Sequence, residues 1–325
     1  MSPQAPVITP DSHFRSRPFK QVDVFTATPY LGNPLAVVLD GTGLDDGTMR
    51  RFAAWTNLSE TTFLLPPTNP AADYRVRIFT PTMELPFAGH PTLGSCHSWL
   101  QAGGQSQSAE FVVQQCQVGL VKIRRESAPG GGQRLAFAAP PLKRSSPGPA
   151  FLSQVAAALG LKAPDILAAQ LLHNGPLWLG LLLDRPETVL RLTPDFRELH
   201  RLNVMVGVAA LYPVEDAPPL IGRINREARA FAQTAGPATD EGFVPQLEVR
   251  AFVEPVGVPE DPVTGSLNAS LAQWLMADGH IGERYCASQG ICIDRAGQVY
   301  LARDADGQVW VGGETVTCID GQVRL

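Results

Sequence analysis

The stretch VRIFTPTMELPFAGHPTLGSCHSWLQAGG, residues 76–104, reads as a strand, a loop, a helix and a glycine stop in that order. Val76 and Ile78 alternate with polar residues, as in a half-buried strand. Because proline is tolerated in the first turn of a helix, a helix is predicted from about Pro91 to Leu100, ended by the glycine pair at 103–104. His90 therefore lies at or near the start of this helix.

The same order of elements recurs in the second half of the chain. VRIF at 76–79 returns as VRAF at 249–252, and WLQAGG at 99–104 returns as WLMADG at 274–279. Strand and helix motifs begin at 76 and 99 in the first copy and at 249 and 274 in the second, so the second loop is two residues longer. This paired spacing indicates a duplicated unit.

The chain length and a proline-rich segment predict two domains. A chain of 325 residues exceeds the size at which single cores stop growing. The proline-rich segment FAAPPLKRSSPGPA, residues 137–150, separates an N-terminal domain over 19–140 from a C-terminal domain over 150–325. Helices are predicted at 45–56, 91–100, 151–159 and 187–201, and strands at 19–26, 34–40, 61–66, 74–79, 110–125, 176–183, 204–212 and in a hairpin over 298–313 turning at Asp306-Gly307.

Composition argues against several classes of partner. The net charge is −5, and the 26 Lys and Arg residues are scattered, so a nucleic-acid surface is not expected. No window approaches the roughly 20 apolar residues of a membrane span, and the first 18 residues contain no apolar core of signal-peptide length. We therefore expect no membrane contact and a cytoplasmic location.

The motifs of several common enzyme classes and metal sites are absent. The chain contains no GxSxG elbow, no GxxxxGK[ST] loop and no GxGxxG after a strand. The pairs His90/His97 and Cys286/Cys292 lack further ligands at usable spacing, so no metal site is expected. Five cysteines without CxxC spacing predict reduced, mostly buried thiols.

The two predicted helix starts suggest an anion site. Free N–H groups at a helix start, beside glycines that let a ligand approach, bind an anion without a basic side chain. Two facing starts, one at Gly89 and His90 and the other at Gly265 and Ser266, would hold a carboxylate. Local sequence also allows His90 to be a capping or core residue, and 260–262 to be a surface turn.

Several motifs in this chain together resemble those of the PhzF family of phenazine biosynthesis, within the diaminopimelate-epimerase-like fold. In chain order they are QVDVFT, GNPLAVV, NLSETTF, FTPTMELPFAGHPTLG, EDPVTGS and SQG. The resemblance runs from about residue 19 to the C-terminus. It implies an α+β fold of two pseudo-symmetric domains, each a mixed sheet or barrel around a central helix, with a cleft between them and a final strand that can return to the first domain.

The resemblance also implies roles for individual residues. Glu60 matches the family's acid/base, and His90 and Asp261 match polar residues that line the cleft. The substrate-binding positions match Ser59, Gly89, Gly265 and Ser266. The implied activity, of the trans-2,3-dihydro-3-hydroxyanthranilate isomerase type, moves a proton between carbons of a small carboxylic acid without cofactor or metal, in a homodimer. Related epimerases use two facing cysteines, whose places here are predicted to hold Ala88 and Asp261.

A single carboxylate suits such a reaction, because one base can take a proton from one carbon and return it to another. Burial between the apolar stretches 52–58 and 63–65 is expected to raise the pKa of Glu60 toward neutrality. A local reading of Glu60 as a turn residue between helix and strand remains open. So do two other functions: a racemase or epimerase acting through other residues, and a binding module that keeps the cleft without a reaction.

Overall fold

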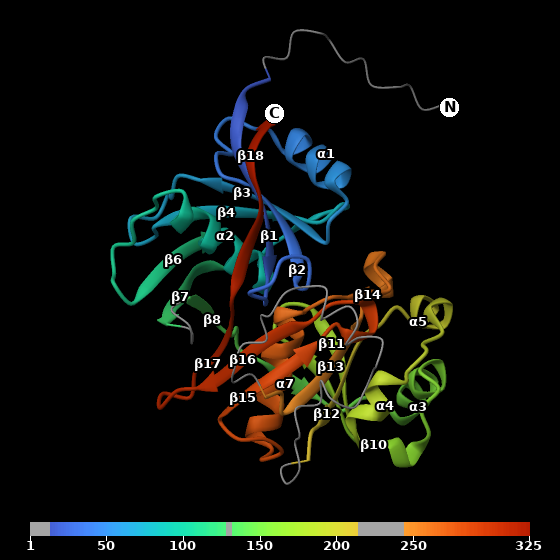
Figure 1. Ribbon diagram of the computed structural model, residues 1–325. Coiled ribbons are helices and arrows are strands. Elements are labelled where there is room, and N and C mark those ends of the chain that lie inside the picture. The colour runs from blue at the N-terminus through green and yellow to red at the C-terminus, as the bar shows by residue number, and fades with distance from the viewer. Residues whose placement is uncertain (1–13, 128–131, 214–243) are drawn as a thin grey trace, which may run out of the picture.

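The computed structural model describes residues 14–127, 132–213 and 244–325. Figure 1 shows two halves, with the N-terminal half above and the C-terminal half below. The last strand, drawn in red, runs from the lower half to the upper one. The halves are built from the same elements in the same order, which follows from the repeated motifs of the sequence.

The first half contains most of its residues in short strands around one buried helix. Its elements are β1 (Ser16–Val24), β2 (Asn33–Val38), α1 (Asp46–Thr56), β3 (Glu60–Leu65), β4 (Tyr74–Phe79), β5 (Glu84–Leu85), α2 (Gly89–Gln101), β6 (Phe111–Cys116), β7 (Gly119–Ser127) and β8 (Gln133–Ala138). Helix α1 begins at the cap Asp45, whose carboxylate accepts a hydrogen bond of 2.6 Å from the backbone N–H of Thr48.

The second half repeats this plan with additional helices on its outer face. Its elements are β9 (Lys143–Ser145), α3 (Pro149–Ala158), β10 (Ile166–His173), β11 (Leu177–Leu183), α4 (Pro186–Leu190), α5 (Phe196–Leu202), β12 (Met205–Leu211), β13 (Leu247–Phe252), β14 (Glu260–Asp261), α7 (Gly265–Ala277), β15 (Arg284–Gln289), β16 (Gly297–Arg303), β17 (Val309–Gly313) and β18 (Thr315–Arg324). Short 3₁₀ turns occupy Ala163–Asp165, Glu254–Val256 and Ile291–Ile293.

Strand pairing repeats between the halves. In the first half β1–β2 is antiparallel, β2–β3 parallel, β3–β4 and β4–β5 antiparallel, β4–β6 parallel, and β6–β7 and β7–β8 antiparallel. The series from β10 to β17 has the same orientations in the same order. The duplication inferred from the sequence motifs is thus present in the backbone topology, and the predicted α+β class with mixed sheets is confirmed.

Each half also gives a strand to the other. Strand β18 follows β17 and pairs antiparallel with β1, and β9 follows β8 and pairs antiparallel with β10. Strands β8 and β17 pair with each other. The return of the last strand to the first half was expected, whereas the reciprocal exchange through β9 was not. These pairings join the two halves through the backbone.

The core surrounds the two central helices. Most residues of α2 and α7 are buried, and buried apolar side chains around both helices form one continuous cluster that includes Leu93 and Leu267. Two further clusters lie under α1 and under α3, α4 and α5, on the outer faces of the strands. Both helices are buried on nearly all sides, and α2 includes the buried polar residues Ser95 and Ser98, whose hydroxyls donate to Thr62 and to the carbonyl of Gly94.

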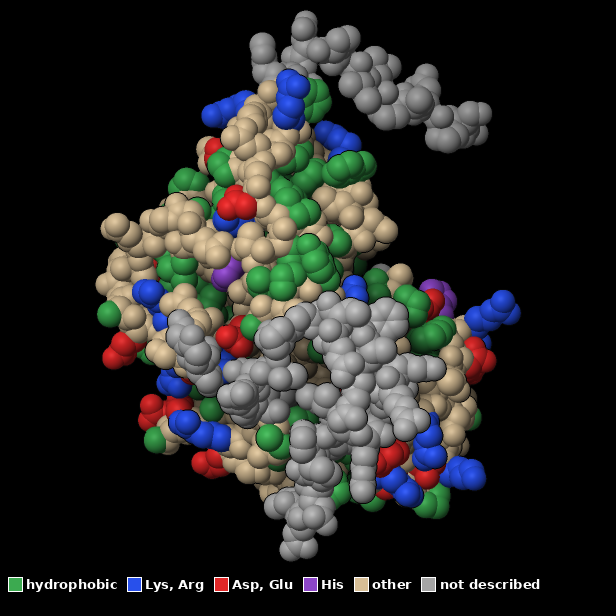
Figure 2. Space-filling model, viewed as in Figure 1, with side chains coloured by type: hydrophobic (Ala, Val, Ile, Leu, Met, Phe, Trp, Pro, Cys, Tyr) green, Lys and Arg blue, Asp and Glu red, His purple; other side chains and the backbone are tan. Residues whose placement is uncertain are grey.

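Some predicted details differ from the structure. The single helix expected over 187–201 is two helices, because Pro194 interrupts the segment and Asp195 caps α5 by accepting a hydrogen bond from the N–H of Glu198. None of the five cysteines forms a disulfide bond, and only Cys96 is buried. Within the described part of the chain, no helix is long and apolar enough to span a membrane. On the face in Figure 2, Lys and Arg side chains are scattered among acidic ones.

Candidate active site

The N-termini of α2 and α7 meet where the two halves touch. A Cβ atom on Gly265 would lie 3.0 Å from the Cα of Gly89 and 3.2 Å from the backbone nitrogen of His90. A Cβ on Gly89 would lie 2.7 Å from the Phe137 ring. Only glycine allows this approach without displacing a neighbour. Neither helix has a side-chain cap, so the N–H groups of two helix starts converge without a local acceptor.

The loops that lead into these helices are equivalent. Glu84 lies opposite Phe79 in β4, and Glu260 lies opposite Phe252 in β13. Each glutamate accepts two hydrogen bonds from the arginine of the repeated strand motif: Arg77 in the first half and Arg250 in the second. The segments ELPFAGH and EDPVTGS therefore correspond residue by residue.

This correspondence corrects one prediction about the cysteine positions. The residue immediately before Gly89 is Ala88, and the residue immediately before Gly265 is Thr264. Asp261 lies four residues before Gly265, so it is not the counterpart of Ala88. The conclusion that no cysteine pair faces the cleft is unchanged, because neither Ala88 nor Thr264 is a thiol.

Glu60 and His90 face each other in the first half. Glu60 begins β3, and its side chain is 15% exposed; His90 lies in the first turn of α2, and its side chain is 5% exposed. Glu60 Oε2 and His90 Nε2 are 3.3 Å apart, yet neither atom completes a hydrogen bond within the described part of the chain. Buried polar atoms are nearly always paired, so this couple is suited to a further partner.

Asp261 reaches the same place from the second half. Its Oδ1 accepts a hydrogen bond of 3.0 Å from Asn33 Nδ2, and its Oδ2 accepts one of 2.6 Å from Thr264 Oγ1. Asn33 begins β2 and also donates to the carbonyl oxygen of Val263, 2.9 Å away. Asn33 therefore connects the first half to the loop that positions Asp261.

Burial and hydrogen bonds shift the pKa values of Glu60, Asp261 and His90 by different amounts. The pKa of Glu60 is raised to about 8, first by burial and then by the charge of Asp261. Burial also raises the pKa of Asp261, but the hydrogen bonds from Thr264 and Asn33 oppose this effect and leave it at about 6. The pKa of His90 falls to about 3 because of burial, although a hydrogen bond from its ring to the Pro34 carbonyl opposes this. Glu60 therefore holds a proton more tightly than Asp261 does, and His90 is neutral near pH 7.

The structure thus brings Glu60, His90, Gly89, Gly265 and Asp261 together. Ser59 and Ser266 are partly buried: Ser59 precedes β3, and Ser266 is the second residue of α7. Three polar residues around Asp261 were not among the sequence candidates, namely Asn33, Thr264 and Gln289. Each lies inside a motif already noted, GNPLAVV, EDPVTGS or SQG, but an amide or hydroxyl alone carries no signal of its role.

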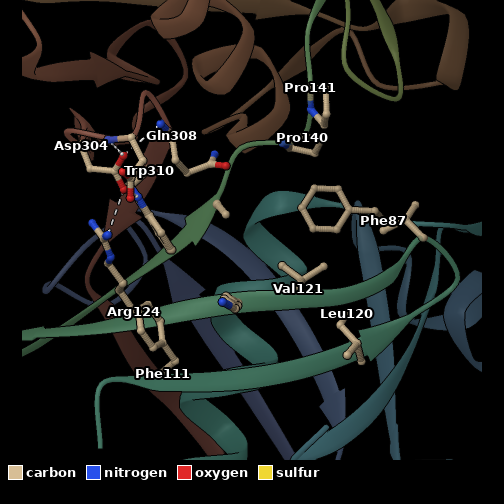
Figure 3. Close-up of a pocket in the computed structure, with 14 residues that line it drawn as sticks. Phe87, Phe111, Leu120, Val121, Arg124, Pro140, Pro141, Asp304, Gln308 and Trp310 are labelled. Atoms are coloured by element: carbon tan, nitrogen blue, oxygen red, sulfur yellow. Dashed lines mark hydrogen bonds and ion pairs between the residues drawn. The ribbon is translucent and has the colours of Figure 1, made fainter. Parts of the chain in front are cut away.

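A metal site and a separate cavity can also be considered in the described residues. These residues contain no group of three or more His, Cys, Asp or Glu side chains arranged to hold a metal ion. A cavity of about 580 Å³ opens over β6, β7, β8 and β17, but none of the seven candidate residues lines it (Figure 3). In that cavity Arg124 lies over the ring of Trp310 and forms an ion pair with Asp304. The charges of Arg124 and Asp304 therefore neutralise each other.

Comparison with known proteins places this geometry in a family. The sequence profile of the family described as phenazine biosynthesis-like protein, PhzC-PhzF, matches residues 22–321. The chain belongs to the PhzF family. The resemblance seen in the motifs is confirmed over nearly the whole chain.

Three PhzF relatives illustrate the range of similarity. Trans-2,3-dihydro-3-hydroxyanthranilate isomerase of Pseudomonas aeruginosa is 30% identical over 94% of this chain and 98% of the relative. Antisense-enhancing sequence 1 of Schizosaccharomyces pombe is 31% identical over 94% of this chain and 97% of its own. The crystal structure of a PhzF-family phenazine biosynthesis protein from Bacillus anthracis superposes with a TM-score of 0.76 at 20% identity, covering 96% of this chain and 100% of that one. This last similarity concerns the fold alone.

Proposed function

We propose that this PhzF-family protein is an isomerase that moves a proton between two carbons of a small unsaturated or cyclic carboxylic acid, without a cofactor. The observation that carries this proposal is the buried pair of Glu60 and His90, whose facing atoms are 3.3 Å apart and complete no hydrogen bond among the described residues, next to the charge of Asp261. The isomerase class is supported by the name of the Pseudomonas aeruginosa relative. The substrate class is argued from the site.

A carboxylate substrate fits the two helix starts. The uncapped first turns of α2 and α7 meet at Gly89 and Gly265, and backbone N–H groups at helix starts favour an anion. A carboxylate held there would place its neighbouring carbons near His90 and, through it, near Glu60. The conjugated acid group would also stabilise negative charge on the carbon skeleton while the proton is away.

The proton shift then needs one group that acts twice. In its ionised form Glu60 removes a proton from one carbon, and the electron pair of that C–H bond moves into the conjugated system. The protonated Glu60 returns the proton to a second carbon, so the substrate is rearranged with no net change in oxidation state. A base with a pKa of about 8 is both basic enough to take the proton and acidic enough to return it near neutral pH.

A racemase that works through two thiols is disfavoured by the same geometry. Ala88 and Thr264 stand directly before the paired glycines, where facing side chains would flank a bound acid. Cys96 is buried within α2, and burial raises the pKa of its thiol well above the usual range. Such a thiol is a poor base at neutral pH.

Heavy-water exchange tests this proposal. The protein is incubated in D₂O with a panel of small unsaturated and cyclohexadiene carboxylic acids, and deuterium at carbon is measured by NMR. We expect incorporation with the wild-type protein, loss of incorporation with Glu60→Gln, and binding of the acid by this variant within about tenfold of wild type. Glu110→Gln, at an exposed glutamate outside the site, is the matched control.

Three results would speak against the proposal. Unchanged exchange in Glu60→Gln would remove this residue from its role as the base. Binding of the acids without exchange by the wild-type protein would favour a binding module. Loss of stereochemistry at a single α-carbon, without migration of a double bond, would favour a racemase or epimerase.

A further inference from the structure

Most hydrogen bonds around Asp261 have their direction fixed by groups that can only donate or only accept. The backbone N–H of Thr264 can only donate, and it donates to Gln289 Oε1 over 3.1 Å. This contact identifies the oxygen of the Gln289 amide, and Asn268 Nδ2 donates to the same oxygen over 2.8 Å. The other end of the Gln289 side chain must then be its NH₂ group, which can only donate.

The Thr264 hydroxyl connects the amide of Gln289 to the carboxyl group of Asp261. Gln289 Nε2 donates to Thr264 Oγ1 over 3.0 Å and to the backbone carbonyl of Asp261 over 3.1 Å. Because the Thr264 oxygen accepts this bond, its own proton is free to point at Asp261 Oδ2, 2.6 Å away. In the structure the Thr264 hydroxyl donates to this oxygen of Asp261.

The second oxygen of Asp261 is fixed in the same way from the first half of the chain. The carbonyl oxygen of Val263 can only accept, so the group of Asn33 that faces it at 2.9 Å is the NH₂ group. The same NH₂ group donates to Asp261 Oδ1 over 3.0 Å. Oδ1 of Asp261 thus faces an obligate donor and Oδ2 faces the proton of the Thr264 hydroxyl, whereas Glu60 Oε2 has no donor within the described part of the chain.

We infer that Gln289, Thr264 and Asn33 are positioning residues that hold Asp261 as a carboxylate, and that its fixed negative charge keeps the mobile proton of the site on Glu60. Gln289, Thr264 and Asn33 are all buried, so water does not compete for these bonds. In this arrangement Asp261 acts as a charge that makes Glu60 a stronger base rather than as a second proton donor. The inference rests on the proposed function, in which Glu60 is the base.

The other ionisable groups around Asp261 do not keep it in its ionised form. His90 is neutral because its pKa is lowered to about 3 by burial. Glu260 raises the pKa of Asp261, but its carboxylate is itself paired with Arg250 over 2.8 and 2.9 Å. The directional hydrogen bonds from Thr264 and Asn33 are the contributions that favour ionised Asp261.

Infrared titration of the carboxyl groups between pH 4 and 10 tests the inference without any substrate. Bands of Asp261 and Glu60 are assigned by their loss in Asp261→Asn and Glu60→Gln. In Thr264→Val the titration midpoint of Asp261 is expected to rise by about one to two pH units, because a hydrogen bond to a charged group is lost. The midpoint of Glu60 is expected to fall, and Thr264→Ser, which keeps the hydroxyl, is expected to restore both.

A matched control lies elsewhere in the chain. Thr188 Oγ1 donates to Asp184 Oδ1 over the same 2.6 Å, so Thr188→Val removes an equivalent threonine–aspartate bond outside the site. This variant should leave both midpoints in place. If Thr264→Val does not fold, Asn33→Ala removes the other donor to Asp261 and carries the same expectation.

The outcomes separate this inference from the proposed function. Midpoints that stay unchanged in Thr264→Val, or that shift equally in Thr188→Val, would overturn the inference even if wild-type protein exchanges protons with an acid. The expected shifts in a protein that exchanges no protons would support the directed network and refute only the reaction.

Discussion

Replacing Glu60 by glutamine removes a buried ionisable group, and we expect the variant to be more stable than wild type at alkaline pH. The wild-type protein must ionise this carboxyl at high pH while it is 15% exposed and close to the charge of Asp261. The amide of glutamine has nearly the same shape and never carries a charge. The gain in stability should therefore depend strongly on pH.

The sign and size follow from the pKa of Glu60 in the two states. Folding raises it from 4.5 to about 8, so the folded state binds this proton more tightly than the unfolded state. The stability associated with protonated Glu60 is fully present below pH 4.5 and is lost as pH rises through 8. At 1.36 kcal/mol per pKa unit, the full loss amounts to roughly 5 kcal/mol, of which roughly 4 kcal/mol falls between pH 4.5 and 9.

Urea denaturation of wild type, Glu60→Gln and Glu110→Gln at pH 4.5, 6, 7.5 and 9 measures this effect. We expect the free-energy difference between Glu60→Gln and wild type to change in favour of the variant by roughly 4 kcal/mol from the lowest to the highest pH. The exposed control should show almost no change. A difference that is constant with pH would refute the reasoning, because it would mean that Glu60 titrates alike in both states.

Three further changes have defined outcomes. Asp261→Asn removes the charge beside the base and should lower the pH midpoint of proton exchange by about one unit, seen in initial rates against pH; an unchanged midpoint would contradict the charge effect. Gly265→Ala places a methyl group 3.0 Å from the Cα of Gly89 and should destabilise the protein by about 1–3 kcal/mol and reduce exchange more than tenfold; a fully active variant would show that the helix starts need not touch. Arg250→Met leaves a buried carboxylate without a partner and should cost about 3–5 kcal/mol in urea denaturation, against about 1 kcal/mol for Arg77→Met in the more exposed equivalent pair; equal losses would contradict the difference in burial.

The sequence predicts the duplicated core well because its signals are local. The strand and helix motifs at 76–104 recur at 249–279, and both copies fold as expected around a buried helix. The reciprocal exchange of strands could not be predicted in the same way. Strand β9 contains only Lys143–Ser145 and is exposed. It is a strand because it pairs with the edge of β10. Pairing of this kind depends on tertiary context rather than on propensity.

The candidate site also has parts that the sequence predicts and parts that it does not. The two helix starts and their glycines were predicted from the repeated loops, and Glu60 was identified from the family motif NLSETTF. The network of Asn33, Thr264 and Gln289 was missed, because these residues are far apart in the sequence and meet only in the folded chain. The sequence separations are large: Asn33 bonds Asp261 across the two halves, and Gln289 reaches Thr264 from the strand after α7.

Transfer of a label within a single turnover tests the central claim most directly, namely that one buried carboxyl of Glu60 both takes and returns the proton, with only partial exchange with water during a turnover. An acid that exchanges in the heavy-water panel is prepared with deuterium at the carbon that loses its proton, and is converted in ordinary water. Because Glu60 is shielded from solvent, we expect a measurable share of the deuterium at the receiving carbon of the product, by mass spectrometry and NMR. Complete loss of the label to water, even at the earliest times, would contradict transfer by a single buried base.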